Sequence, residues 1–146
     1  MNLTDDFSEF VQLLLKNKAE FLVVGGYAVA YHGYPRFTGD IDFWIKRDSD
    51  NAQRVVQSLF DFGFGSVDIT AKDLIQEGNV IQLGFPPNRI DIHTSIDGLL
   101  FDECWNERKM IMIDDTEIPF ISLYHLKINK KATGRKKDEI DLDNLP

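Results

Sequence analysis

Two aspartates one residue apart are the first feature of the sequence that could do chemistry. Asp40 and Asp42 flank an isoleucine in the run Asp-Ile-Asp. Side chains alternate between the faces of a β-strand, so both carboxylates would point the same way, roughly 7 Å apart at the backbone. Paired like charges repel, and a divalent cation such as Mg²⁺ removes that penalty. The alternative is a solvated face of the sheet.

A third aspartate occupies a similar setting further along the chain. Asp91 lies between two isoleucines in a run typical of a strand, as Asp42 lies between two apolar residues. A lone carboxylate on an apolar strand is costly unless it is paired or bound to a metal. Three carboxylates on neighbouring strands would hold two metal ions, which activate an attacking oxygen and stabilise a leaving phosphate. The alternative is an ion pair between Asp91 and Arg89.

Residues suited to phosphate binding precede the Asp40–Asp42 pair. Gly25 and Gly26 end an apolar run, and a short helical segment follows them. Glycines let backbone N–H groups approach a phosphate, and a helix N-terminus favours anions. Arg36 and Thr38 follow in a loop, where Arg36 could contact a triphosphate through two bonds and Thr38 could order the loop. The alternatives are an ordinary turn and an exposed loop arginine.

Other catalytic patterns are missing from the sequence. His32, His93 and His125 show no metal-ligand spacing; His93 could share the face of Asp91, but we interpret it as a structural histidine. There is no phosphate-binding Gly-x-x-x-x-Gly-Lys-Ser/Thr loop. A single cysteine, Cys104, excludes an intramolecular disulfide.

Composition bounds the class of protein. The 146 residues suffice for one domain, and 43% hydrophobic with 27% charged residues is ordinary for a globular protein. A net charge of −8 disfavours sequence-blind binding of nucleic acid by the whole surface. Residues 127–137 nevertheless hold six basic residues and no acid, so they form either a local phosphate-binding patch or a solvated helix face. We expect a cytoplasmic protein without membrane contact, since neither a signal sequence nor a membrane-spanning run is present.

The hydrophobic pattern predicts the elements that position these residues. Helices are expected at residues 5–18, 27–32, 48–62, 73–77, 99–108, 122–132 and 136–145. Strands are expected at residues 21–24, 41–45, 80–85, 89–93, 110–113 and 117–121, with hairpin turns at 86–88 and 114–116. This order predicts an α/β (α+β) domain with a mixed sheet and helices packed on it. We expect one domain, 1–146, with an N-terminal helix (1–19), a catalytic core (20–121) and a C-terminal helical segment (122–146).

Taken together, these motifs resemble a known family. The order of motifs is Gly-Gly, a short helix, Arg-x-Thr-x-Asp-Ile-Asp at residues 36–42 and a later aspartate on a strand. This order is similar to that of the nucleotidyltransferase (DNA polymerase β-like) superfamily. The closest resemblance is to the branch of AbiEii-type toxins and related small bacterial nucleotidyltransferases. The C-terminal helices, with Lys130 and an Arg-x-Lys-Asp stretch at 135–138, also resemble that branch. Many superfamily members have Gly-Ser at the glycine pair, and we interpret Gly-Gly as a mark of the branch.

The resemblance implies a fold, a reaction and a division of roles. Asp40 and Asp42 would hold two Mg²⁺ (or Mn²⁺) ions, and Asp91 would bind one of them and orient or deprotonate the acceptor. A nucleoside monophosphate would pass from a triphosphate such as ATP to an acceptor, with release of pyrophosphate. Fixed cations would meet the charge of the transition state. The residues implied in nucleotide binding are Gly25, Gly26, Tyr27, Arg36, Thr38 and Lys130.

The identity of the acceptor stays open, and so does turnover itself. The acceptor could be tRNA, a protein or a small molecule such as an antibiotic. The alternative is a binding module, such as a toxin–antitoxin component that contacts a cognate partner with little or no turnover, or a plain structural domain. The complete set of carboxylates favours the enzyme. The small size, without a large substrate-gripping domain, favours the module.

Overall fold

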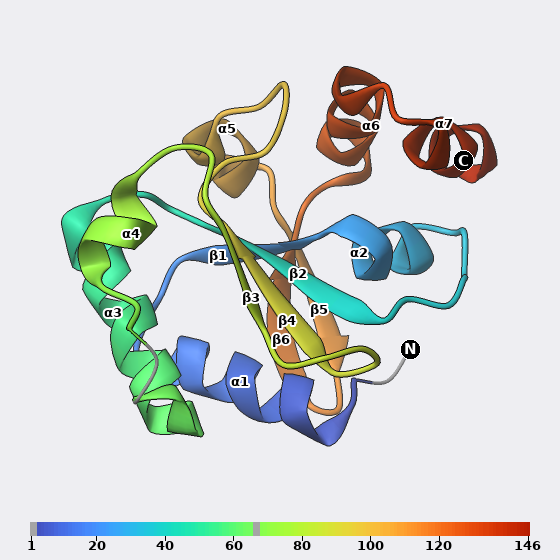
Figure 1. The fold of residues 1–146 in the computed structure, drawn as a ribbon. Coiled ribbons are helices and arrows are strands. Elements are labelled where there is room, and N and C mark those ends of the chain that lie inside the picture. Colours follow the sequence, from blue (N-terminus) through green and yellow to red (C-terminus); the bar gives the residue numbers. More distant parts are fainter. Residues whose placement is uncertain (1–2, 66–67) are drawn as a thin grey trace.

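A six-stranded mixed sheet forms the centre of the molecule. The computed structural model describes residues 3–65 and 68–146. The sheet has the order β3-β4-β2-β1-β6-β5 (Figure 1). Its strands are β1 (Phe21–Val24), β2 (Asp40–Ile45), β3 (Val80–Leu83), β4 (Arg89–His93), β5 (Lys109–Ile113) and β6 (Thr116–Phe120). Strand β2 runs parallel to β4 and antiparallel to β1. The predicted α/β class with a mixed sheet is confirmed.

Helices surround the sheet and form two packed pairs. They are α1 (Asp5–Lys16), α2 (Gly25–Tyr31), α3 (Ser49–Leu59), α4 (Ala71–Ile75), α5 (Phe101–Asn106), α6 (Leu123–Thr133) and α7 (Lys136–Asn144). A π-helical segment, η1 (Phe60–Phe64), continues α3. Helices α1 and α3 pack against each other, while α6 and α7 form a pair beside α2 (Figure 1). The second pair includes the segment that carries the basic residues.

Aromatic packing holds α1 against the sheet. The buried side chains of α1 are Phe7, Phe10, Val11 and Leu14, which recur at helical spacing. The ring of Phe10 lies 5.6 Å from that of Phe43 on β2. Burying one such side chain stabilises the fold by about 1.5–3 kcal/mol. This packing fixes β2, the strand that carries two of the candidate aspartates.

Most predicted elements are confirmed within a few residues. Strands β3 and β4 form an antiparallel pair, and so do β5 and β6. Asp114 and Asp115 both have positive φ (49° and 65°), as the turn of a two-residue hairpin requires. Helix α6 is capped by Ser122 and ends at Gly134 in the left-handed conformation, close to the bounds 122–132 that the sequence predicts.

Several helix boundaries differ from the prediction by two or more residues. The helix expected at 99–108 is confined to Phe101–Asn106. The turn expected at 73–77 begins two residues earlier, because Thr70 and Asp73 form a capping box. Helix α2 starts at Gly25 rather than at residue 27, because Gly25 takes φ +65° and lets the helix follow β1 directly.

Helices of membrane-spanning length and hydropathy do not occur among residues 3–65 and 68–146.

Candidate functional site

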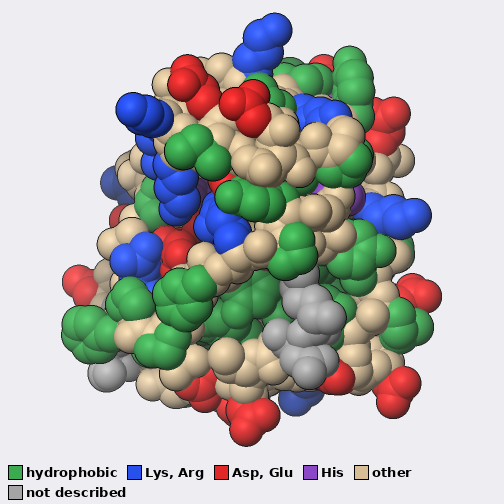
Figure 2. Space-filling view, turned by 90° about the vertical axis from the view of Figure 1, so that its right-hand side faces the viewer, with side chains coloured by type: hydrophobic (Ala, Val, Ile, Leu, Met, Phe, Trp, Pro, Cys, Tyr) green, Lys and Arg blue, Asp and Glu red, His purple; other side chains and the backbone are tan. Residues whose placement is uncertain are grey.

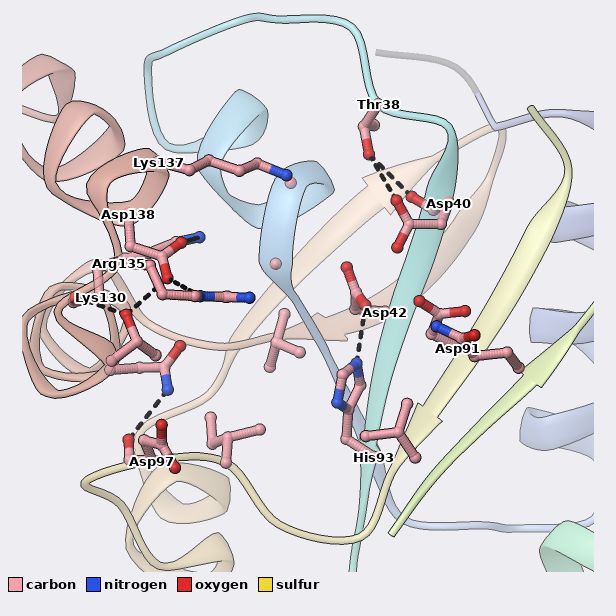
Figure 3. Close-up of a pocket in the computed structure, with 18 of the residues that line it drawn as sticks. Thr38, Asp40, Asp42, Asp91, His93, Asp97, Lys130, Arg135, Lys137 and Asp138 are labelled. Carbon is pink, nitrogen blue, oxygen red and sulfur yellow. Dashed lines mark hydrogen bonds and ion pairs between the residues drawn. The ribbon is translucent and has the colours of Figure 1, made fainter. Parts of the chain in front are cut away.

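The pairing of β2 with β4 brings the three predicted aspartates together. In this parallel pair, Asp42 lies opposite Asp91 and Asp40 lies opposite Arg89. Residues opposite each other on neighbouring strands point to the same face of a sheet. The three carboxylates therefore converge on one face, as Figure 3 shows, while Ile41 is fully buried on the other. The convergence predicted from the sequence is confirmed.

This face forms the floor of a cavity of about 600 Å³. Helices α6 and α7 supply the opposite wall, and α2 closes one end (Figure 3). Lys and Arg side chains gather around a recess on the face of the molecule seen in Figure 2. The residues that line the cavity include Gly25, Gly26, Arg36, Thr38, Asp40, Asp42, Arg89, Asp91, His93, Lys130, Arg135, Lys137 and Asp138.

Arg89 holds two of the three carboxylates. Its Nε lies 2.8 Å from Oδ1 of Asp91, and its Nη2 lies 3.0 Å from Oδ2 of Asp91 and 3.3 Å from Oδ2 of Asp40. The ion pair that the sequence offered as an alternative thus exists together with the predicted convergence. Asp91 is only 3% exposed. Burial raises its pKa to about 6, with Asp40 and Asp42 adding to the rise and Arg89 opposing it.

His93 belongs to the same cluster, although sequence reasoning did not select it. Its Nε2 lies 2.7 Å from Oδ1 of Asp42. Asp42, Asp91 and His93 each offer a ligand atom, and these atoms all lie within 4.8 Å of one another. The available signal was the two-residue spacing from Asp91, which places both side chains on one face of β4. A set of carboxylates with one imidazole suits a divalent cation, with the carboxylates favouring Mg²⁺ or Mn²⁺.

The glycine pair makes room for two side chains of the site. A Cβ on Gly25 would lie 2.1 Å from Oδ2 of Asp42, and φ of Gly25 is +65°. A Cβ on Gly26 would lie 2.9 Å from Oγ1 of Thr38. Thr38 in turn donates its hydroxyl to the backbone oxygen of Asp40 at 3.0 Å, which orders the loop before β2 as predicted. Contact of the glycines with a phosphate stays a prediction.

Tyr27 faces a second, smaller pocket of about 320 Å³. This pocket is lined mainly by apolar side chains, among them Phe37 and Pro87, and it shares Arg36 and Thr38 with the main cavity. Burial and the nearby charge of Asp40 raise the pKa of the Tyr27 phenol. Tyr27 does not line the main cavity, so its predicted contact with a triphosphate there has no support from its position.

Arg36 and Lys130 line the main cavity, but both are bound to carboxylates of α7. Arg36 makes two hydrogen bonds of 2.8 Å to Asp141. The Lys130 ammonium lies 2.9 Å from Asp138 and 3.1 Å from Asp141, and Lys130 is only 5% exposed. Their predicted contacts with phosphate stay predictions, made less direct by these partners.

Thr133 and the exposed Arg135 complete this ionic cluster. Burial alone would raise the pKa of Asp138, but hydrogen bonds from Thr133, Lys130 and Arg135 outweigh it and lower the pKa to about 2. Burial is likewise outweighed at Asp141, where Arg36 and Lys130 lower the pKa. The cluster therefore keeps both buried carboxylates ionised and ties α6, α7 and the loop before β2 to one another.

Comparison with solved structures identifies the fold. The lincosamide antibiotic adenylyltransferase LnuA, solved with lincomycin bound, superposes with a TM-score of 0.61 over 99% of this chain and 97% of its own. The Thermotoga maritima protein TM1012, itself assigned as a nucleotidyltransferase, gives a TM-score of 0.64 over 94% of this chain and 88% of its own. This chain has a nucleotidyltransferase fold.

The likeness lies in the fold rather than in the sequence. Sequence identity is 17% with LnuA and 18% with TM1012. No family model and no curated protein sequence matches the chain. The nucleotidyltransferase fold expected from the motifs is confirmed, whereas the resemblance to the AbiEii-type branch stays a resemblance. Within this fold, the carboxylate face of β2 and β4 is the candidate active site.

Proposed function

We propose that this chain is a metal-dependent nucleotidyltransferase that moves a nucleoside monophosphate from a nucleoside triphosphate to an acceptor and releases pyrophosphate. The observation that carries the proposal is the convergence of Asp40, Asp42 and Asp91 on one face of the sheet, beside a cavity of about 600 Å³. That volume lies within the usual range of about 300–1,000 Å³ for ligand sites.

The carboxylates would hold two Mg²⁺ or Mn²⁺ ions. The arrangement fits such ions because Asp42, Asp91 and His93 already present ligand atoms within 4.8 Å of one another. The ions would supply positive charge for the phosphates and activate the acceptor oxygen. His93 fixes the orientation of Asp42 through the 2.7 Å contact or itself serves as a ligand. Arg89 keeps Asp40 and Asp91 side by side, and its hold on Asp91 must loosen when a cation takes those oxygens.

Asp91 is the residue suited to take the acceptor proton. Its side chain is only 3% exposed and lies opposite Asp42 on the paired strand, beside the proposed cations. Burial raises its pKa to about 6, and a bound cation would lower that value again. Asp40 and Asp42 are more exposed, and their part is to hold cations and phosphate oxygens rather than to exchange protons.

In the form of the proposal that we favour, the donor is ATP and the acceptor is a small molecule. The fold alignment spans 99% of this chain and 97% of LnuA, a protein named as an antibiotic adenylyltransferase. The small size of the chain, which we gave as a reason for a binding module, is therefore also the size of an adenylyltransferase. The mainly apolar pocket beside Tyr27 and Phe37 offers a surface for an acceptor with an apolar body. A tRNA or protein acceptor remains an outcome for the experiment to decide.

The ion pair between Arg89 and Asp91 is the observation that favours the alternative, a binding module or toxin–antitoxin component with little turnover. A carboxylate bound at 2.8 and 3.0 Å by a guanidinium already has a cation, so a metal must compete for it. Such a module would co-purify with a stoichiometric partner and transfer no nucleotide.

Transfer of label tests the proposal. We incubate the purified chain with Mg²⁺, a cell extract and each of the four triphosphates in turn, labelled at the α-phosphate. The products are then separated by size to distinguish small-molecule, protein and RNA acceptors. We expect label in the small-molecule fraction, its loss in Asp42→Asn, and normal labelling in Asp143→Asn, which changes an exposed aspartate of α7. Equal labelling by wild type and Asp42→Asn would refute the assignment of the site.

A further inference from the structure

The basic side chains around the main cavity differ in whether a carboxylate already holds them. Each of four has a carboxylate partner at 3.1 Å or less: Arg36, Arg89, Lys130 and Arg135. Lys137 lines the same cavity and makes no ion pair with any residue in the described ranges 3–65 and 68–146. Figure 3 shows its side chain extending from α7 across the cavity toward the start of α2.

Lys130 is poorly placed to exchange partners. It is 5% exposed, and its two carboxylate partners, Asp138 and Asp141, are each 1% exposed. Withdrawing the ammonium toward a ligand would take one buried cation away from both Asp138 and Asp141, which is unfavourable for buried carboxylates. The side chain therefore joins α6 to α7 and does not reach out to a ligand.

The anchoring of Asp138 fixes the place of Lys137. Asp138 accepts hydrogen bonds from Lys130 at 2.9 Å, from Thr133 at 2.6 Å and from Arg135 at 2.8 Å. Gly134, in the left-handed conformation, turns the chain between α6 and α7 so that the first turn of α7 lies at the rim of the cavity. The backbone of Lys137 is thus held in place, while its exposed side chain keeps its charge free.

We propose that Lys137 binds the β- and γ-phosphates of the nucleoside triphosphate. Lys130 is then a positioning residue, which holds α7 in place through its ion pairs with Asp138 and Asp141. The inference rests on the proposed function and moves the phosphate-neutralising role from Lys130 to Lys137. A free ammonium can bind a phosphate without leaving a buried carboxylate unpaired. The polyphosphate tail would then lie between the first turn of α7 and the start of α2, at one end of the carboxylate face.

Affinity for nucleotides of different length tests this directly. Isothermal titration with Mg²⁺ compares a non-hydrolysable ATP analogue, ADP and AMP on wild type, Lys137→Ala, Lys136→Ala and Lys130→Met. We expect Lys137→Ala to weaken the triphosphate analogue by about tenfold or more, to weaken ADP less and to leave AMP unchanged, as loss of a charge-assisted contact predicts. Lys136, the exposed neighbour that does not line the cavity, is the matched control and should have no effect.

The melting temperature separates the two lysines. Lys137→Ala should melt with the wild type, whereas Lys130→Met should melt at a lower temperature because two buried carboxylates lose a partner. Unchanged binding of the triphosphate analogue by Lys137→Ala would overturn the inference while the proposed function stands, and so would an equal loss for AMP. Failure of the wild type to bind any triphosphate with Mg²⁺ would overturn the proposed function and this inference together.

Discussion

Two groups of aspartates lie in or beside the main cavity and differ in the cations around them. The sheet carboxylates are Asp40, Asp42 and Asp91 on β2 and β4, and the helix carboxylates are Asp138 and Asp141 on α7. Three basic side chains, Arg36, Lys130 and Arg135, hold the two helix carboxylates. The sheet carboxylates share one arginine, Arg89, and the imidazole of His93.

The pKa values show the consequence of that difference. Hydrogen bonds to cations and to Thr133 keep the pKa of Asp138 at about 2 although the side chain is buried. Burial raises the pKa of Asp91 to about 6, because one arginine does not compensate for burial and for two neighbouring aspartates. Identical side chains thus have opposite roles. Matched charges make the helix carboxylates part of the structure, whereas an excess of negative charge suits the sheet carboxylates to the binding of added cations that we propose.

Removal of one sheet carboxylate should give the largest effect. We expect Asp42→Asn to lower nucleotide transfer by about 10³-fold or more, since charge stabilisation of the transferred phosphate is usually the dominant catalytic contribution. The free energy of unfolding should stay within about 0.5 kcal/mol of wild type or rise, because a repulsive charge is lost. Steady-state transfer assays and urea unfolding measure the two effects. A large loss of stability would show that Asp42 is structural, like Asp138.

Removal of Lys130, the buried cation beside the helix carboxylates, should instead lower the stability of the fold. Lys130→Met should lower the free energy of unfolding by about 3–5 kcal/mol, because Asp138 and Asp141 lose a buried partner. Urea unfolding followed by circular dichroism measures the change. Lys131→Met, on the exposed side of the same helix, is the control and should stay within about 0.5 kcal/mol of wild type. Equal stability of the two variants would contradict the structural role of Lys130.

Strong acid should destabilise the fold by protonating the helix carboxylates. The pKa of Asp138 is about 2 in the fold, below its ordinary value of 3.8. Ionised Asp138 therefore stabilises the fold above pH 3.8, and this contribution, about 2 kcal/mol, is lost as the pH falls toward 2. Unfolding free energies measured in steps across this range should fall less steeply in Asp138→Asn than in wild type. Parallel pH dependences would show that Asp138 is not held in ionised form by its partners.

The smallest effect concerns the backbone beside Asp42. Gly25 and Gly134 have nearly the same φ, +65° and +63°, but only a Cβ on Gly25 would meet another group, Oδ2 of Asp42 at 2.1 Å. Alanine at either position should cost about 1–2 kcal/mol of stability through left-handed strain. Gly25→Ala should in addition weaken Mn²⁺ binding by about tenfold, roughly 1.4 kcal/mol, because Asp42 must shift. Equal Mn²⁺ affinity in both variants would show that the contact does not position Asp42.

Much of the fold could be predicted from local patterns. The helical spacing of α1, the caps of α6 and the hairpins around residues 86–88 and 114–116 depend on neighbours in the sequence. The sheet carboxylates could be predicted for a similar reason. Asp42 and Asp91 needed only to lie at equivalent places on strands that pair, and alternation along each strand then sets their common face.

The helix carboxylates show where prediction from sequence ends. The partner of Arg36 is Asp141, 105 residues away, and no local pattern links the two. Lys130 looked like a surface lysine in a basic segment, and only the packing of α6 on α7 shows that it is buried. The contact of His93 with Asp42 likewise depends on the pairing of β4 with β2. Such long-range partners decide which charges are free, and therefore which residues can bind a ligand.

Counting bound Mn²⁺ shows whether the sheet carboxylates form a metal site. Electron paramagnetic resonance can count the ions bound per chain in the presence of a non-hydrolysable triphosphate, for wild type, Asp42→Asn and Asp138→Asn. We expect two ions in wild type, loss of binding in Asp42→Asn and two ions in folded Asp138→Asn. Absence of bound Mn²⁺ in wild type, or equal binding by wild type and Asp42→Asn, would contradict the assignment of the sheet carboxylates as the metal and nucleotide site.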